Sequence, residues 1–304
     1  SGAIRLARAY TGRDHVAVCG YHGWQDWYIG STARNLGVPA ATRRLTHGFN
    51  YNDIDSLHAI FKRCRSTVAA VIMEPMNVAE PENGFLESVR ELAHKNGALF
   101  IFDETVTGFR FANGGAQEYF GVTPDLATFG KGLANGYPVS AVAGRADIMK
   151  LMEEVFFSFT FGGETLSLTA ALATMKKMEK EPVIETIWRQ GAKAKKAVET
   201  MIKRHGLSEA LSVKGKDCWS FLIFKDTQTY SQWEIKTLFL QEMFAKGILT
   251  IGTHNMSYAH SDADIEKLTS AYDNAFGVIK EVLAEKTIDK RLKAKPLVPL
   301  FKVR

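Results

Sequence analysis

Short runs of apolar residues recur along the first part of the chain, and several end on a polar or charged residue. The runs cover residues 15–19, 67–73, 98–102, 125–129 and 139–143. Continuous apolar runs of this length, rich in β-branched residues, are typical of strands buried on both faces of a parallel sheet. Helix-like segments separate them, one capped by Asp53 and another ended by Gly97. This alternation predicts an α/β fold with a mostly parallel, doubly wound sheet and a site at the strand carboxyl ends.

The remaining segments predict more helices, one long loop and a second domain. Helices are expected at 3–10, 53–63, 85–96, 146–154, 165–180 and from there to His205, and a loop at 20–52. After Pro182 the pattern changes to strand-like segments at 213–216 and 219–224 and long helices at 232–246 and 262–285. We therefore expect a large domain over 1–181 and a smaller α+β domain over 182–304.

Two strand ends carry the residues best suited to chemistry. The run 98–102 ends on the carboxylates Asp103 and Glu104, and the run 126–129 leads to Lys131 between two glycines. Glycines beside a lysine allow unusual backbone angles and close approach of a ligand, and such an amine suits Schiff-base chemistry. A buried carboxylate needs a charged or multiply hydrogen-bonded partner, which a protonated heteroaromatic nitrogen or Arg110 would supply.

Simpler roles remain open for these residues at this point. Lys131 could be a surface lysine on a turn, and Asp103 could cap a turn or pair with Arg110. A phosphate-binding P-loop is excluded, because Gly132 stands where that motif needs Ser or Thr. Tyr21 and His22 could stack on a flat ring or only pack a loop, and Thr160, near two glycines, could bind a phosphate or cap a helix.

Composition narrows the functional classes. The 304 residues are 46% hydrophobic, with a net charge of +5 and no basic run interleaved with aromatic residues. We expect no nucleic-acid role and no membrane role. The three cysteines are widely spaced, which favours a reducing, cytoplasmic compartment and argues against a zinc site. His254 and His260, six residues apart, fit no helix-face metal spacing, so we expect no metal.

Taken together, several segments resemble the class III, pyridoxal-phosphate-dependent aminotransferases of fold type I. The matching segments are ARAYTGRDHV, GYHGW, VIMEP, IFDETVTGFRF, PDLATFGKGLANGYPVSAVAG and SYAHSDADI. The resemblance implies that Lys131 forms an aldimine with pyridoxal 5'-phosphate and that Asp103 pairs with the pyridine nitrogen. It also implies cofactor contacts from Tyr21 and Thr105. Thr160 would reach the phosphate of a neighbouring subunit, which implies a homodimer with shared active sites.

Three functions are compatible with this resemblance. The first is transfer of an amino group from a small-molecule donor to a carbonyl acceptor. The second is the glutamate-1-semialdehyde 2,1-aminomutase reaction. The short apolar segment 152–159 and Trp24 favour a transaminase, because aminomutases carry a longer glycine-containing segment and usually a small polar residue or His at these places. The third is a non-catalytic fragment, since the family's main phosphate loop would precede Ser1 and we expect the chain to be truncated at its N-terminus.

Overall fold

The computed structural model describes residues 1–298, which divide into two compact units. The first is Ser1–Glu181 and the second begins at Pro182. Pro182 stands between the helices α8 (Thr165–Lys180) and α9 (Val183–His205) and precedes the first residue of α9, a place where its missing N–H costs no helical hydrogen bond. Residues 299–304 of the expected second domain lie outside the described residues.

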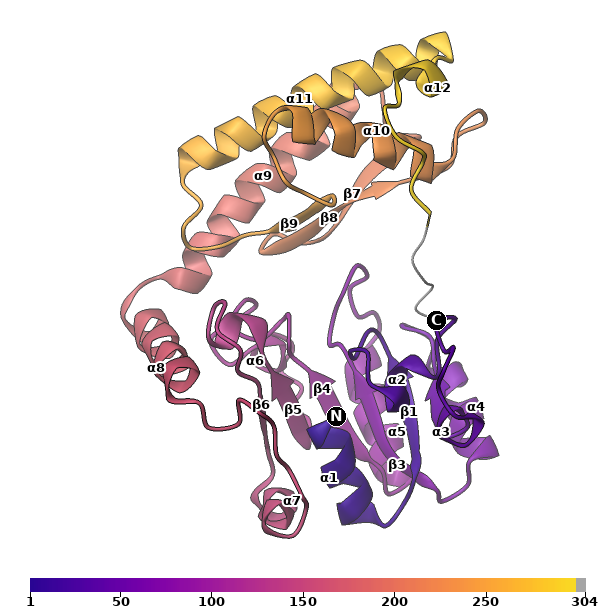
Figure 1. Cartoon of the computed structure of the whole chain (residues 1–304), viewed down its shortest axis with the longest axis vertical. Helices are drawn as coiled ribbons and strands as arrows, with labels where there is room; N and C mark the ends of the chain where they lie inside the picture. The colour runs from indigo at the N-terminus through magenta and orange to yellow at the C-terminus, as the bar shows by residue number, and fades with distance from the viewer. Residues whose placement is uncertain (299–304) are drawn as a thin grey trace. The chain divides into compact units, whose positions relative to one another are not determined.

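The first unit is built on a mixed, mostly parallel sheet (Figure 1). Its strands within residues 1–298 are β1 (His15–Cys19), β2 (Thr46–Gly48), β3 (Val68–Met73), β4 (Leu99–Asp103), β5 (Leu126–Phe129) and β6 (Ala141–Gly144). Their order is β2-β1-β3-β4-β5-β6, and only the pairing of β5 with β6 is antiparallel among these described strands. The sequence-based prediction of a mostly parallel sheet is confirmed.

Both faces of this sheet are buried, as the residues of a single strand show. Alternate residues of a strand point to opposite sides of the sheet. In β1, Val16 and Val18 join one hydrophobic cluster and Ala17 and Cys19 join another. The helix α1 (Gly2–Thr11) contributes to the first cluster, while α4 (Ile54–Arg63) and α5 (Phe85–Lys95) contribute to the second. The parallel strands therefore bring their carboxyl ends to one edge of a rigid layer.

Local sequence signals set most helix ends as predicted. The sequence-based prediction missed or misassigned several elements of only one turn. Asp53 caps α4 by accepting a hydrogen bond from the Ser56 backbone at 3.1 Å, and Gly97 follows α5 with a φ of +68°. The expected loop at 20–52 instead contains α2 (Asp26–Ile29), α3 (Ala40–Arg43) and β2. The expected helix at 146–154 is divided into α7 (Ala146–Met149) and the 3₁₀ turn η2 (Lys150–Glu153), and α6 (Ala116–Phe120) and η1 (Lys131–Leu133) were not predicted. Elements of one turn are too short to show a period.

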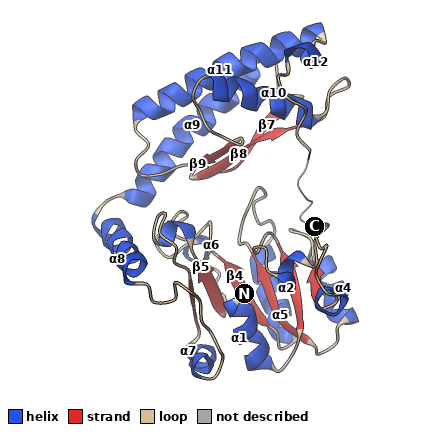
Figure 2. Ribbon diagram, viewed as in Figure 1, coloured by secondary structure: helices blue, strands red, loops and turns tan. Residues whose placement is uncertain are grey.

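The second unit is an antiparallel three-stranded sheet with helices, as the described residues have it (Figure 2). Its elements after α9 are β7 (Leu211–Lys216), β8 (Trp219–Phe224), α10 (Gln232–Ala245), β9 (Thr253–Asn255), α11 (Asp262–Glu285) and α12 (Ile288–Arg291). Reciprocal capping boxes begin α10 and α11, formed by Ser231 with Glu234 and by Ser261 with Asp264. Within residues 1–298, no helix has both the length and the apolar character that a membrane span requires.

A polar triad lies inside this second unit. The buried His254 of β9 hydrogen-bonds through Nδ1 to the Ser220 hydroxyl at 2.8 Å and through Nε2 to the Tyr272 hydroxyl at 2.7 Å. Burial lowers the pKa of His254 to about 4, because a charged imidazole would lose its hydration. The folded protein therefore holds His254 neutral at pH values where an unfolded chain would protonate it.

This difference makes the second unit sensitive to acid. A free histidine titrates near pH 6.5, so between there and about pH 4 the unfolded state binds the extra proton and the folded state does not. The contribution of His254 is complete above about pH 6.5 and is lost as the pH falls, by up to about 3 kcal/mol. We expect the melting temperature to fall less between about pH 7 and pH 5 in His254→Gln, which does not titrate, than in the wild type.

Scanning calorimetry at the two pH values measures this effect. His58→Gln, a change at an exposed histidine of α4, is the control and should retain the wild-type pH dependence. Equal pH dependence in the wild type and His254→Gln would contradict the assignment.

Candidate active site

Four neighbouring parallel strands bring polar residues to the carboxyl edge of the first unit's sheet. Tyr21 and His22 follow β1, Glu74 follows β3, Asp103 ends β4, and Lys131 follows β5. The strands are adjacent in the order β1-β3-β4-β5, so these five residues lie along one edge. This is the position at which ligands bind in doubly wound α/β folds.

Asp103 is the centre of a hydrogen-bond network. Its Oδ2 lies 2.8 Å from His22 Nδ1, and its Oδ1 accepts from the Thr105 backbone and hydroxyl at 3.1 and 2.5 Å and from the Thr128 hydroxyl at 3.2 Å. Burial alone would raise the pKa of Asp103, but the hydrogen bonds from His22 and Thr105 outweigh it and hold the pKa at about 2. The carboxylate therefore stays ionised across the neutral pH range.

His22 is a buried partner of Asp103. Its side chain is 1% exposed, and its other nitrogen, Nε2, lies 3.1 Å from the Cys19 carbonyl oxygen. Both oxygens are hydrogen-bond acceptors, so the imidazole ring is held between two acceptors. Because the His22 ring is buried and both its nitrogens contact protein oxygens, His22 positions the Asp103 carboxylate. Stacking on a ligand ring, the other sequence-based expectation, would need an open face that this buried ring lacks.

Tyr21 is positioned by a residue whose role the sequence did not reveal. The Tyr21 backbone N–H donates to Glu74 Oε2 at 2.9 Å, and Asn77 donates to the same oxygen at 3.1 Å. Burial raises the pKa of the Glu74 carboxyl above its ordinary value. Gly20 permits this contact, since its φ is +101° and a Cβ there would lie 2.5 Å from Glu74 Oε2. The Tyr21 side chain is left 44% exposed at the sheet edge.

The two consecutive carboxylates at the end of β4 have different roles. Glu104 is 1% exposed and accepts from the Thr107 hydroxyl at 2.5 Å and from the backbones of Ala116 and Gln117 at 2.8 and 2.9 Å. Glu104 is therefore the inward-facing acid, and it is satisfied by the loop that follows β4. Asp103 is the carboxylate that faces the site edge.

Lys131 is exposed and begins η1 directly beyond β5. Its φ is +41°, an angle that costs a side-chain-bearing residue about 1–2 kcal/mol. The register pairs Asp103 with Thr128, three residues before Lys131, and a Cβ on Gly130 would lie 3.5 Å from the Thr105 methyl carbon. Backbone strain of this kind concentrates at functional positions.

Thr160 lies apart from this network. It is exposed on the segment between η2 and α8 and lines an open groove of about 1360 Å³ that includes Trp24 and Ser140. The cap of α8 is Glu164, whose carboxylate accepts from Leu166 and Ser167, so the capping role considered for Thr160 is wrong. No hydrogen bond found within residues 1–298 joins Thr160 to Asp103 or Lys131.

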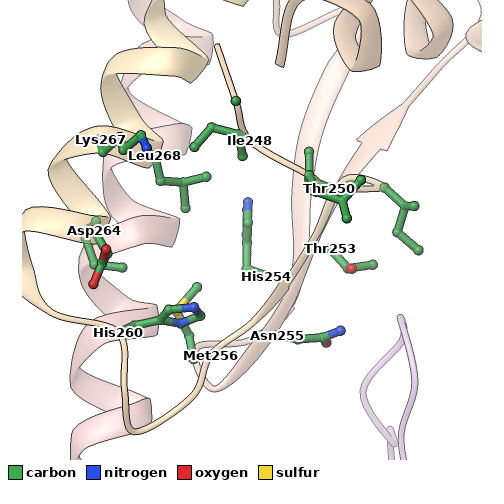
Figure 3. A pocket seen from close by; sticks show the side chains of 14 residues that line it. Ile248, Thr250, Thr253, His254, Asn255, Met256, His260, Asp264, Lys267 and Leu268 are labelled. Carbon is green, nitrogen blue, oxygen red and sulfur yellow. The ribbon is translucent and has the colours of Figure 1, made fainter. Parts of the chain in front are cut away.

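The second unit contains a pocket of about 560 Å³ (Figure 3). Side chains before and within β9, such as Thr250 and Thr253, and the first turns of α11, with Asp264 and Lys267, line it. Asp264 accepts from the Ser261 hydroxyl at 2.7 Å and His260 Nδ1 from the Ser257 backbone at 3.2 Å. None of the six predicted site residues lines this pocket, and all six belong to the first unit.

Comparison with known proteins identifies the family of the chain. The family model for aminotransferase class III matches residues 2–274. A 3-aminobutyryl-CoA aminotransferase from Cloacimonas acidaminovorans is 34% identical, over 92% of this chain and 69% of the relative. A glutamate-1-semialdehyde 2,1-aminomutase from Alkaliphilus oremlandii is 36% identical, over 92% of this chain and 71% of the relative.

A solved structure has the same fold. The FumI protein of Sphingopyxis sp. MTA144, in its pyridoxal-phosphate internal aldimine form, superposes with a TM-score of 0.84 at 29% identity and covers 93% of this chain and 69% of its own. An omega-transaminase from Sphaerobacter thermophilus superposes with a TM-score of 0.83 at 24% identity, over 92% of this chain and 72% of its own. The chain thus belongs to the class III aminotransferases, a fold type I enzyme of amino transfer whose cofactor is pyridoxal 5'-phosphate.

Proposed function

We propose that Lys131 is the residue that holds the cofactor's reactive carbon and that Asp103 pairs with its ring nitrogen. The strongest support is the position of these two residues at the ends of the adjacent parallel strands β4 and β5. Asp103 is a largely buried carboxylate with a lowered pKa, and Lys131 has a strained backbone. A carboxylate with a pKa of about 2 is a suitable partner for a pyridinium proton. The first unit, 1–181, would then be the cofactor-binding domain.

The bound cofactor supplies an electron-withdrawing ring that makes the α-proton of an amino compound acidic. Lys131 is an exposed residue, and its amine is the group that we propose takes this proton and returns it, as general base and then general acid. His22 keeps Asp103 ionised throughout. Tyr21 and Thr105 are proposed to lie against the two ring faces.

A second copy of the chain would complete the site. The segment 156–163 exposes Phe156, Phe159 and Phe161 by 79%, 56% and 58%, and Trp24 beside the same groove is 76% exposed. Exposed aromatic groups gathered in this way mark interaction surfaces. We propose an isologous homodimer in which Thr160, at the centre of this segment, reaches the cofactor phosphate in the partner's site.

A transaminase is favoured over an aminomutase as the reaction of this chain. Relatives of both names are similar to it. The segment 152–159 that precedes Thr160 is short and apolar, which supports transfer between a separate amino donor and a keto or aldehyde acceptor. The three cysteines are free and buried, which supports a cytoplasmic location.

Lys131 can be identified by trapping the cofactor. Borohydride reduction of the yellow holoenzyme followed by peptide mass analysis should place the phosphopyridoxyl group on Lys131. Lys131→Ala should lower the turnover number by at least about 10²-fold, because the proton-transfer group is lost. Lys150→Ala, a change at an exposed lysine beyond β6, should leave it unchanged. Label on another lysine would refute the assignment, and a colourless protein would favour the non-catalytic alternative.

The Asp103 network predicts a change in pH dependence. Asp103→Asn should lower turnover by about 10²-fold or more while cofactor remains attached, because an amide cannot form the ion pair. In His22→Gln the pKa of Asp103 should rise toward its ordinary value, so activity should be lost at a higher pH on the acid side. Thr128→Val, which removes the longer 3.2 Å contact, should shift this limb less. Profiles of kcat against pH that coincide for the wild type and His22→Gln would argue against the network.

Shared active sites can be tested by mixing two defective chains. Lys131→Ala and Thr160→Ala subunits, exchanged at random, form heterodimers with one intact site, so activity should recover to about a quarter of the wild-type value. Sedimentation analysis should show the dimer. If Thr160 served its own chain, the mixture would gain nothing over the separate variants, and sharing would be disproved.

A further inference from the structure

A second cluster of reactive side chains lies at the opposite, amino edge of the first unit's sheet. His15 is the first residue of β1, His47 lies in the neighbouring parallel strand β2, and Cys64 follows the last residue of α4. His15 and His47 are 32 residues apart and Cys64 is a further 17. The parallel pairing of β1 and β2, with Ala17 opposite His47, brings these distant residues together.

The cluster has the donor atoms and spacing of a metal site. His15 Nδ1 lies 2.8 Å from His47 Nε2, and Cys64 Sγ lies 3.4 Å from the same nitrogen. One ligand atom from each residue falls within 4.8 Å of the other two. The two imidazole rings lie edge to edge and nearly coplanar, with centroids 5.1 Å apart and planes 9° from parallel. Cys64 is buried and both histidines are partly buried, so the donors converge from three elements into a sheltered place.

These distances are close to those that one ion would impose. Bonds of about 2.1 Å to nitrogen and 2.3 Å to sulfur at tetrahedral angles place neighbouring ligand atoms about 3.4–3.6 Å apart. The sulfur–nitrogen distance already fits, and the two nitrogens need to separate by about half an ångström. Two imidazoles and a thiolate, with no carboxylate in the set, select a borderline-soft cation over calcium or magnesium.

We propose that His15, His47 and Cys64 bind a Zn²⁺ ion, with the fourth position open to water. This revises the expectation of no metal, which rested on the wide spacing of the cysteines and on the spacing of His254 and His260. The ion would join the three-residue edge strand β2 and the end of α4 to β1, and so stabilise the first unit. It stands at the other edge of the sheet from Asp103 and Lys131 and is independent of their roles.

The protons around His47 show what binding must displace. Arg63 Nη2 donates to His47 Nδ1 at 3.3 Å, so the neutral ring carries its proton on Nε2, where it donates to His15 Nδ1. When Zn²⁺ takes Nε2, that proton moves to Nδ1 and the Cys64 thiol releases its proton to solvent. A protonated Nδ1 cannot accept from Arg63, so the exposed arginine side chain must turn away. Arg63 is therefore predicted to weaken the site.

Metal titration of the holoenzyme tests this site. Zn²⁺ measured in competition with a chromophoric chelator should bind at one ion per chain, and Co²⁺ in its place should give a thiolate-to-cobalt charge-transfer band. Cys64→Ser and His47→Gln should each weaken binding by at least about 10-fold and Cys64→Ser should abolish the band. Cys218→Ser, a change at a buried cysteine of the second unit, should keep both.

Arg63→Gln provides a change in the opposite direction. The glutamine carbonyl can accept from the protonated Nδ1, as outer ligands of zinc-bound histidines commonly do, so this variant should bind Zn²⁺ several-fold more tightly. Zn²⁺ should also raise the melting temperature of the wild type and of Arg63→Gln but not of Cys64→Ser. Absence of the charge-transfer band in the wild type, or equal Zn²⁺ affinity in the wild type and a folded Cys64→Ser, would overturn the proposal.

Discussion

The hydrogen bond between His22 and Asp103 is the interaction on which the candidate site depends. It joins the residues after β1 to the end of β4, across the end of β3, which lies between them in the sheet. Glu74 occupies that intermediate position. The pKa values of the two acids are shifted in opposite directions, since hydrogen bonds lower the pKa of Asp103 and burial raises that of Glu74. Divergent pKa values of neighbouring acids are characteristic of catalytic sites.

One strand, β1, connects both edges of the first unit. Its carboxyl end leads to Tyr21 and His22, and its first residue, His15, belongs to the histidine–cysteine cluster. Because β1 is buried on both faces, neither end can shift without disturbing the hydrophobic clusters. The sheet therefore acts as a rigid support for chemistry at one edge and for a proposed structural ion at the other.

Much of this arrangement was predictable from the sequence, because it depends on local patterns. The apolar runs located the parallel strands, and the polar residues after them, Asp103 and Lys131 included, indicated the edge at which we propose that the cofactor binds. What the sequence could not predict depends on contacts between distant segments. Examples are the Glu74–Tyr21 contact and the meeting of His47 with Cys64, which the β1–β2 register decides. A carboxylate after the buried strand β3 was the one available signal for Glu74.

The hydrogen bonds of Glu104 restrict how the length of the segment after β4 can change. Its single carboxylate binds the backbone of Ala116 and Gln117, 12 and 13 residues further along the chain, and so closes the connection after β4 into a ring of defined length. A Cβ on Gly115 would lie 2.7 Å from Glu104 Oε1, which leaves no slack at the closure. Substitutions at exposed positions of this connection can be absorbed locally, whereas an insertion or deletion would open the ring at the residue next to Asp103. Length, more than composition, is the property of this segment on which the closure depends.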